Sequence, residues 1–489
     1  MTASPSPATL DVPTTFDLPT TFDLIVIGAG PVGENVADRA RRGGLSAAVV
    51  ESELVGGECS YWACMPSKAL LRPGQALSEA ASVAGSRQAV TGGLDAAAVI
   101  ERRDSFASHW DDAGQVEWLD GAGITLIRGH GRIDGERRVV VETASGTVAL
   151  EARHAVVVAT GSDAAVPPIP GLDGVRPWTS REATSARSVP SELLVLGGGV
   201  VGCEMAQAWS TLGARVHIVE MAGSLLPGHE SFAGDLLAEA MAEAGIEVLT
   251  STRVEAARRK ASGRVGVSLA GGGDLEADEL LVAVGRRPRT RDIGLETVGL
   301  EPGAWLEVDD TMRVKGCGGG WLYAAGDVNH RALLTHQGKY QARVCGDVIA
   351  ARAGGEAAPG PWSPLNATAD HAAVPAVVFT TPEVASVGYT ESAARQAGID
   401  VKVVDYSLGQ VAGASLYADG YRGRARIVVD QARRVIVGAT FVGAGVAELL
   451  HSATVAVVGE VPLDRMWHAV PAYPTISEVW LRLLEGYGL

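Results

Sequence analysis

Two cysteines lie five positions apart in a glycine-rich stretch, and a pair at this spacing could carry redox chemistry. Cys59 and Cys64 sit within Gly56–Lys68, and the residues that follow, Ala69-Leu70-Leu71, favour a helix. In a regular helix the Cα atoms of such a pair are roughly 8–9 Å apart, beyond the ~7 Å limit for a disulfide. The sequence therefore predicts a distorted helix start, which the preceding glycines and Pro66 permit.

The position of this pair at a helix N-terminus also bears on its reactivity. A helix N-terminus lowers the pKa of a thiol and so favours the reactive thiolate. Two buried structural cysteines are the alternative interpretation of the same spacing. The segments on either side decide between the two.

The segment before the cysteines has the pattern of a dinucleotide-binding unit. A short apolar strand at 24–27 is followed by Gly28-Ala29-Gly30-Pro31-Val32-Gly33, by a predicted helix to about Arg42, and by a strand at 45–50 that ends at Glu51. The glycines allow a tight turn and close approach to a pyrophosphate. The helix N-terminus attracts the phosphates, and the acid binds ribose hydroxyls. The order strand, glycines, helix, strand and acid makes this prediction specific.

The same unit returns later in the chain. A strand at 193–196 precedes Gly197-Gly198-Gly199-Val200-Val201-Gly202, and a strand at 216–219 ends at Glu220, with 23 residues from first glycine to acid in both copies. Two units imply two dinucleotides. Glu220 would repel a 2′-phosphate and accept a hydrogen bond from a free 2′-hydroxyl, so we expect NADH to be preferred over NADPH. Arg215 could oppose this preference, but it precedes the strand.

The bulk composition limits the partners and the compartment. The 489 residues are 47% hydrophobic and 20% charged, and suggest about three domains. A net charge of −16 argues against nucleic acid or an anionic membrane surface as partner. No apolar run approaches the ~18 residues of a membrane span. The first Lys or Arg is Arg39, which argues against a secretory or transit peptide.

The number of cysteines bears on the compartment. Five cysteines are few, and an odd number cannot all pair, which argues against a secreted disulfide framework, so we predict a redox pair in the cytoplasm. Residues 1–22, which contain PTTFDL and the start of its second copy, are predicted to be a disordered tail.

The rest of the chain contains further strand ends and, from about residue 374, a different pattern of predicted secondary structure. From about residue 374, strands with turns are followed by helices, which predicts a third, α+β domain. Apolar strands that end in glycine turns precede Thr160-Gly161, Gly285 and Gly326-Asp327, and the C-terminal region carries Tyr473 and Glu478.

Together these motifs resemble the pyridine nucleotide–disulfide oxidoreductases, a family that includes dihydrolipoamide dehydrogenase, glutathione and mercuric reductases and soluble transhydrogenase. The resemblance covers about residues 23–489. It implies an α/β fold with two Rossmann-like domains, for FAD and for NAD(P), plus a C-terminal α+β dimerisation domain. It also implies a homodimer that uses FAD and NAD(H), with NADP(H) less favoured. The expected ranges are 1–22 for the tail, 23–165 and 300–355 for the FAD domain, 166–299 for the NAD(P) domain and 365–489 for the dimerisation domain.

The resemblance assigns roles to individual residues. Cys64 would face the flavin and Cys59 would exchange with substrate, while Lys68 would pair with Glu204 near flavin N5. Gly326-Asp327 would reach the flavin ribitol. No metal site is expected. The full set expected at the cofactors is Gly28, Gly30, Gly33, Glu51, Gly57, Lys68, Thr160, Gly161, Gly197, Gly199, Gly202, Glu220, Gly285, Gly326 and Asp327.

Three departures from the family pattern bear on function. Glu58 replaces a common Thr before the first cysteine, and an acid there could raise the pKa of Cys59 or steer the substrate. Tyr61-Trp62 adds aromatic bulk near the pair, and a Trp there resembles transhydrogenase, although packing alone would also explain it. Tyr473 takes the place of the catalytic His, with Glu478 retained. A phenol with an ordinary pKa near 10 is a poor base at neutral pH, whereas imidazole is well matched.

The sequence therefore predicts an FAD-dependent NAD(P)H oxidoreductase of the dihydrolipoamide dehydrogenase type. Hydride would pass from NADH through FAD to the Cys59–Cys64 disulfide or to an external acceptor. The intact pair favours a disulfide as acceptor, and Tyr473 and Trp62 favour a quinone or similar acceptor. A transhydrogenase-like flavoprotein with little disulfide reductase activity is a further alternative, which the intact pair disfavours.

Overall fold

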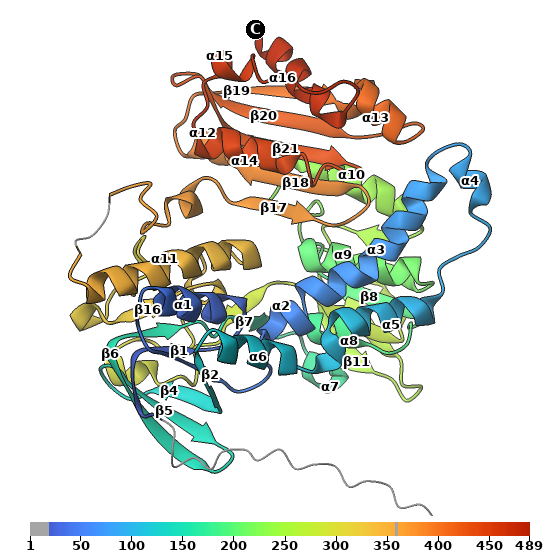
Figure 1. The fold of residues 1–489 in the computed structure, drawn as a ribbon. Coiled ribbons are helices and arrows are strands. Elements are labelled where there is room, and N and C mark those ends of the chain that lie inside the picture. Colours follow the sequence, from blue (N-terminus) through green and yellow to red (C-terminus); the bar gives the residue numbers. More distant parts are fainter. Residues whose placement is uncertain (1–18, 357–359) are drawn as a thin grey trace, which may run out of the picture.

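The computed structural model describes residues 19–356 and 360–489, arranged around a seven-stranded, a four-stranded and a five-stranded sheet (Figure 1). Residues 1–18 of the predicted tail lie outside the described residues. The predicted end of that tail at residue 22 is wrong, because β1 already begins at Thr21. Thr21 and Phe22 pair with Glu151 and Ala152, and Phe22 is buried, so the second PTTFDL copy is drawn into the strand.

The seven-stranded sheet carries the first dinucleotide unit. Its order is β3-β2-β1-β6-β5-β4, with β16 also paired to β6, and its central strands are parallel. Helices α1 and α11 lie side by side along it (Figure 1). Apolar residues of α1 at helical spacing, Val36, Ala37 and Ala40, are buried at this contact. The bounds are β1 Thr21–Ile27, α1 Pro31–Arg42, β2 Ala47–Glu51, β3 Thr125–Arg128, β4 His130–Ile133, β5 Arg138–Thr143, β6 Gly146–Val158, β16 Leu322–Ala324 and α11 Thr335–Ala353.

The four-stranded sheet carries the second dinucleotide unit. Its strands are all parallel, in the order β10-β9-β8-β14, and a three-stranded antiparallel sheet, β11-β12-β13, lies beside it. The bounds are β8 Glu192–Leu196, α9 Val200–Thr211, β9 Arg215–Val219, α10 Ser231–Glu243, β10 Glu247–Leu249, β11 Val254–Arg259, β12 Val265–Leu269, β13 Asp274–Ala277 and β14 Glu279–Val282.

A two-stranded pairing ties these two units together and marks where the chain returns to the first. β7, Ser162–Ala164, pairs with β15, Arg286–Pro288. Ile293 and Leu295, which follow, are buried in the core of the first unit. The chain therefore returns to the first unit near residue 286. The second segment of the FAD domain, which the sequence placed from residue 300, begins earlier than predicted.

The C-terminal region is an antiparallel sheet covered by helices, and forms the orange and red part of Figure 1. Its strand order is β17-β18-β21-β20-β19. With the two parallel units, this confirms the predicted fold class. The bounds are β17 Pro375–Val378, β18 Glu383–Gly388, α12 Glu391–Gln396, β19 Val401–Ser407, α13 Ala412–Tyr417, β20 Arg424–Asp430, β21 Val435–Gly443, α14 Leu450–Val458, α15 Leu463–Met466 and α16 Val479–Tyr487.

The remaining α-helices connect these units, and α2 and α3 carry Cys59 and Cys64. They are α2 Gly57–Tyr61, α3 Cys64–Ala81, α4 Ser86–Ala89, α5 Ala96–Phe106, α6 Ala113–Gly121, α7 Leu172–Val175 and α8 Ser180–Ser185. Within the described ranges, no helix is long and apolar enough to cross a membrane.

Candidate active site

The two cysteines stand on either side of a helix break. α2 ends at Tyr61, and α3 begins at Cys64 after Ala63, whose backbone angles of φ −138° and ψ −97° are not helical. The distortion predicted from the cysteine spacing is therefore present. Cys59 and Cys64 are free thiols in this structure and both are partly buried.

The environments of the two thiols push their pKa values apart. The pKa of Cys64 is lowered to about 6, mainly by a hydrogen bond from the Cys59 thiol, and further by Thr335 and the charge of Lys68, against burial that raises it. Thr335 Oγ1 lies 3.1 Å from Cys64 Sγ. The pKa of Cys59 is raised, first by its hydrogen bond to Cys64 and then by burial. Cys64 is thus the thiolate of the reduced pair, and Cys59 keeps its proton.

The predicted pair of Lys68 and Glu204 is formed. Lys68 Nζ donates to Glu204 Oε2 at 2.7 Å, and Phe379 N donates to Glu204 Oε1 at 3.0 Å. The Glu204 side chain is only 4% exposed, so its charge depends on these donors. Glu204 therefore holds the ammonium group of Lys68, which lies one helical turn after Cys64 on α3.

A cavity of about 900 Å³ opens at the carboxyl end of the first parallel sheet. The expected cofactor residues Gly28, Gly30, Glu51, Gly57, Thr160, Gly161, Gly326 and Asp327 line it, together with Cys59 and Thr335.

The lining of this cavity fits a dinucleotide such as FAD. Gly30 is the N-cap of α1 and offers no side-chain cap, which leaves backbone N–H groups free for a phosphate. A Cβ on Gly28 would lie 2.5 Å from Ala159 O, so the turn has no room for a side chain. Thr160 Oγ1 is buried without a hydrogen-bond partner among the described residues, and it lines the cavity.

The two dinucleotide units repeat each other at the level of single hydrogen bonds. Glu51 accepts from Ala29 N at 2.7 Å and from Glu53 N at 2.8 Å. In the second unit, Glu220 accepts from Gly198 N at 2.5 Å and from Ala222 N at 2.6 Å. The same offsets along the chain therefore produce the same carboxylate geometry in both units.

The last glycine of each turn packs against the first glycine of the same turn. A Cβ on Gly33 would lie 1.9 Å from the carbonyl oxygen of Gly28, and a Cβ on Gly202 would lie 1.9 Å from that of Gly197. These two glycines therefore serve helix–strand packing rather than contact with a ligand. Arg215 pairs with Glu192 at 2.9 Å at the start of β9, while Glu220 follows its end, so Arg215 does not compete with the acid.

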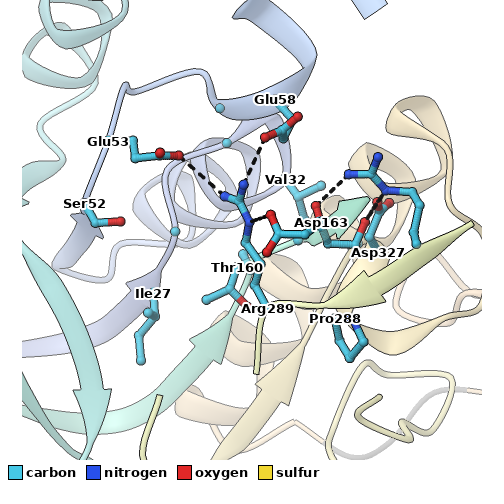
Figure 2. Close-up of a pocket in the computed structure, with 18 of the residues that line it drawn as sticks. Ile27, Val32, Ser52, Glu53, Glu58, Thr160, Asp163, Pro288, Arg289 and Asp327 are labelled. Atoms are coloured by element: carbon cyan, nitrogen blue, oxygen red, sulfur yellow. Dashed lines mark hydrogen bonds and ion pairs between the residues drawn. The ribbon is translucent and has the colours of Figure 1, made fainter. Parts of the chain in front are cut away.

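A charged cluster borders the cavity next to Cys59. Figure 2 shows Arg289 among Glu53, Glu58 and Asp163. Arg289 donates to Glu58 at 2.9 Å and to Asp163 at 2.5 Å, and Arg181 donates to both Glu53 and Glu58.

This cluster corrects the expectation that Glu58 raises the pKa of Cys59. The charge of Glu58 is balanced by two arginines, and the raised pKa of Cys59 comes from Cys64 and burial. Trp62 lies under Arg181, whose guanidinium carbon is 4.2 Å from the ring centre, so this Trp holds the cluster rather than filling a core.

Two of the predicted catalytic residues stand apart from the cysteines within one chain. Tyr473 is 78% exposed, and Glu478 accepts from Gly413 N at 3.3 Å in the C-terminal region. Neither has a hydrogen bond or ion pair to the 59–68 segment in the part of the chain that the structure describes. Gly285 does not line the cavity, although Arg286 and Arg287 after it do.

Three lining residues were not anticipated from the sequence. Thr335 at the start of α11 contacts Cys64, and Arg286 donates to Ser162 Oγ at 2.5 Å. Ser162 in turn donates to Asp327 at 2.5 Å. The signal for Arg286 was its position directly after Gly285 at a strand end. Nothing local pointed to Thr335.

Two segments of the chain match one described family. Residues 22–345 match the family described as "Pyridine nucleotide-disulphide oxidoreductase", and residues 374–483 match the dimerisation domain of that family. The dimerisation match supports a homodimer.

Individual relatives span nearly the whole chain. Dihydrolipoyl dehydrogenase 3 of Pseudomonas aeruginosa is 35% identical over 93% of this chain and 95% of its own. A mercuric reductase of Acidithiobacillus ferrooxidans is 32% identical over 93% of this chain and 80% of its own. Among solved structures, LpdA of Mycobacterium tuberculosis has a TM-score of 0.80 and 27% identity, covering 95% of this chain and 100% of its own.

Proposed function

The chain belongs to the pyridine nucleotide–disulphide oxidoreductase family, and we propose that its Cys59–Cys64 pair passes electrons from NADH to a small disulfide. The protein is an FAD-dependent, NAD(H)-using oxidoreductase. The observation that carries the proposal is the placement of the pair at the cavity: Cys59 lines it, Cys64 contacts Thr335 at 3.1 Å, and the Lys68–Glu204 ion pair lies one helical turn after Cys64. The lowered pKa of Cys64 and the raised pKa of Cys59 agree with this placement. The FAD that the cavity residues would hold would supply the two-electron chemistry that links NADH oxidation to reduction of the disulfide.

The residues around the pair divide the work between them. Cys64 holds the thiolate, which Thr335 and Lys68 stabilise. Cys59 keeps the proton, and the family pattern supports Cys59 as the thiol that exchanges with an incoming disulfide. Glu204 holds Lys68 in place at 2.7 Å. The carboxylates of Glu51 and Glu220 bind the ribose hydroxyls of FAD and NAD(H), respectively.

A homodimer with a shared site accounts for the position of Tyr473. In one chain Tyr473 is largely exposed and forms no contact with the cysteines among the described residues. We infer that Tyr473 and Glu478 of one subunit face Cys59 of the other. There Tyr473 would donate a hydrogen bond to the substrate, while Glu478 orients it.

A quinone or a similar acceptor is the second candidate substrate, and Tyr473 favours it. Thiol exchange needs a base for the Cys59 proton, and a phenol rarely serves as one near neutral pH. Reduction of a quinone through the flavin does not need this base. A transhydrogenase-like activity is the weaker alternative, because the intact thiol pair has no part in it.

A turnover comparison separates these candidates. NADH oxidation is measured with lipoamide and with a benzoquinone for the parent, Cys59→Ser and Cys64→Ser. If a disulfide is the substrate, both serine variants lose lipoamide turnover and keep quinone turnover. Equal lipoamide rates in the parent and in either serine variant would refute the proposed function.

A further inference from the structure

The backbone between the two cysteines is interrupted, so helix geometry alone does not fix how closely the two thiols approach each other. α2 ends at Tyr61, and Ala63 has non-helical backbone angles before α3 begins at Cys64. Cys59, which lies on α2, could therefore move relative to Cys64 by rotation at this break. Contacts from other parts of the chain must hold α2 in place if the pair is to reach the geometry of a disulfide.

Arg181 on α8 contacts α2 on both sides of Cys59. Its Nε donates to the carboxylate of Glu58, the residue directly before Cys59. Its guanidinium carbon lies 4.2 Å from the centre of the Trp62 ring, and Trp62 is the C-cap of α2. One planar, charged group therefore reaches from the residue before Cys59 to the residue at the helix break.

The Arg181 side chain is fixed by further contacts. It donates to the two carboxylate oxygens of Glu53 at 2.9 Å and 2.6 Å, and it is only 28% exposed. Thr184, one turn later on α8, has its Oγ1 3.0 Å from Trp62 O. The fully buried Arg103 donates to Thr184 O at 2.6 Å and ties α8 to α5. α8 therefore provides a firm support from which Arg181 holds α2.

We propose that Arg181 positions the redox pair. By holding α2, it keeps Cys59 within bonding reach of Cys64 and so stabilises the disulfide. It is a positioning residue in this account, because it acts through α2 and not on the sulfur atoms. The inference deepens the proposed function and rests on it, since it takes this pair as the couple that cycles. It also gives one common role to Glu58 and Trp62, which both depart from the family pattern.

Exchange with glutathione disulfide shows what this positioning contributes. The Cys59 thiolate attacks one sulfur of glutathione disulfide, and the first glutathione leaves. The Cys64 thiolate then attacks the mixed disulfide, and the second glutathione leaves. One S–S bond breaks in glutathione, one forms in the protein, and the two thiol protons end on the two glutathione molecules. A segment that is already held in place loses less conformational entropy when this bond closes.

The equilibrium of the pair with glutathione tests the proposal. The FAD-loaded protein is equilibrated anaerobically in buffers of reduced and oxidised glutathione, without NADH. It is then quenched with acid and alkylated, and mass spectrometry quantifies the disulfide between Cys59 and Cys64. Arg181→Met should lower the equilibrium constant for disulfide formation about tenfold, the effect of losing one charge-assisted hydrogen bond. The reduction potential of the pair then rises by about 30 mV.

Arg128→Met is the matched control. Arg128 donates to Glu53 O at 2.8 Å and to Asp112 at 2.6 Å, so it binds the same loop as Arg181 but through atoms outside residues 58–64. This variant removes the same charge from the same neighbourhood, and should change the equilibrium constant by less than about twofold.

A double-mutant comparison asks whether Arg181 acts through Trp62. Trp62→Leu removes the ring under Arg181 and should lower the equilibrium constant about threefold, the size of a partly exposed cation–π contact. In the Arg181→Met background the same substitution should change the constant by less than about 1.5-fold, because the contact is already lost. Two independent effects would instead multiply.

Three results overturn the inference. A parent-like equilibrium constant in Arg181→Met, an equal loss in Arg128→Met, or an effect of Trp62→Leu that is undiminished without Arg181 each removes the positioning role. If Arg181→Met does not retain FAD, Arg181→Lys replaces it. This variant keeps the charge but not the planar group and should lose about threefold, so a parent-like constant overturns the proposal. The assay contains neither NADH nor an acceptor, so a quinone as the only acceptor would refute the proposed function and leave this shift unchanged.

Discussion

The hydrogen bond between Thr335 and Cys64 gives the sharpest single-residue prediction. Thr335→Val removes the hydroxyl that lies 3.1 Å from Cys64 Sγ and keeps the shape of the side chain. A hydrogen bond to a charged group contributes about 1.5–3 kcal/mol, and we take the lower end because sulfur is a weak acceptor. This value corresponds to about one pKa unit.

The expected change is large in mildly acidic solution. The pKa of Cys64 should rise from about 6 to about 7 in Thr335→Val. At a pH midway between these values, the thiolate fraction of Cys64 falls from about three quarters to about one quarter. Because the pKa of Cys59 is raised, alkylation at this pH reports Cys64 and not its partner.

The assay follows iodoacetamide labelling of Cys64 against pH in the reduced, FAD-loaded protein, with mass spectrometry to identify the site. Thr335→Ser retains the hydroxyl and serves as the control, with a midpoint close to that of the parent. If the midpoint of Thr335→Val coincides with that of the parent, the Thr335 hydroxyl does not stabilise the thiolate and the account of Cys64 is wrong.

Three further predictions concern nucleotide choice, the missing base and stability. Glu220→Ala should relax the preference for NADH, since the repulsion of a 2′-phosphate is lost; stopped-flow flavin reduction by each nucleotide measures this, and a parent that prefers NADPH would show Glu220 misinterpreted. Tyr473→His should raise lipoamide turnover by about tenfold or more, because imidazole accepts a proton near pH 7; a parent that already reduces lipoamide as fast as a quinone would contradict this. The pKa of Glu34 lies above its ordinary value of 4.5, so the unfolded chain releases this proton first and stability is lost as pH rises from about 4.5 to about 8. Glu34→Gln should therefore raise the Tm in alkaline solution and have little effect near pH 4, and calorimetry showing an equal gain at both would refute this reasoning.

Features encoded in contiguous sequence could be predicted, because local patterns determine them. The glycine turns and the acids Glu51 and Glu220 are read directly from spacing, and both carboxylates bind the backbone of their turn. The helix break between Cys59 and Cys64 followed from the geometry of an i/i+5 pair.

Features built from distant segments could not be predicted. Thr335 is 271 residues from Cys64, and Arg289 is 231 residues from Glu58. Neither partner carries a local signal, since a Thr at a helix start and an Arg after a strand are both common. The balanced charge of Glu58 therefore appeared only in the structure, and of the two roles expected for this acid, an effect on the pKa of Cys59 is wrong while steering of the substrate stays a prediction.

The start of the first strand illustrates a third limit. Both copies of PTTFDL read the same, so local sequence does not say where the strand begins. Pairing of Thr21 with Glu151 on β6 decides it, and that contact spans 130 residues. Propensity at a strand end is weak compared with such a tertiary contact.

The measurement that most directly tests the central claim is a thiol count after anaerobic reduction by NADH. The oxidised, FAD-loaded protein is titrated with NADH and then alkylated, and Cys59 and Cys64 are quantified by mass spectrometry. We predict that both become alkylatable only after NADH is added, and that Cys64→Ser gains no new reactive thiol on reduction. Flavin bleaching by NADH with no gain of reactive Cys59 and Cys64 would show that electrons bypass the pair, and would contradict the account.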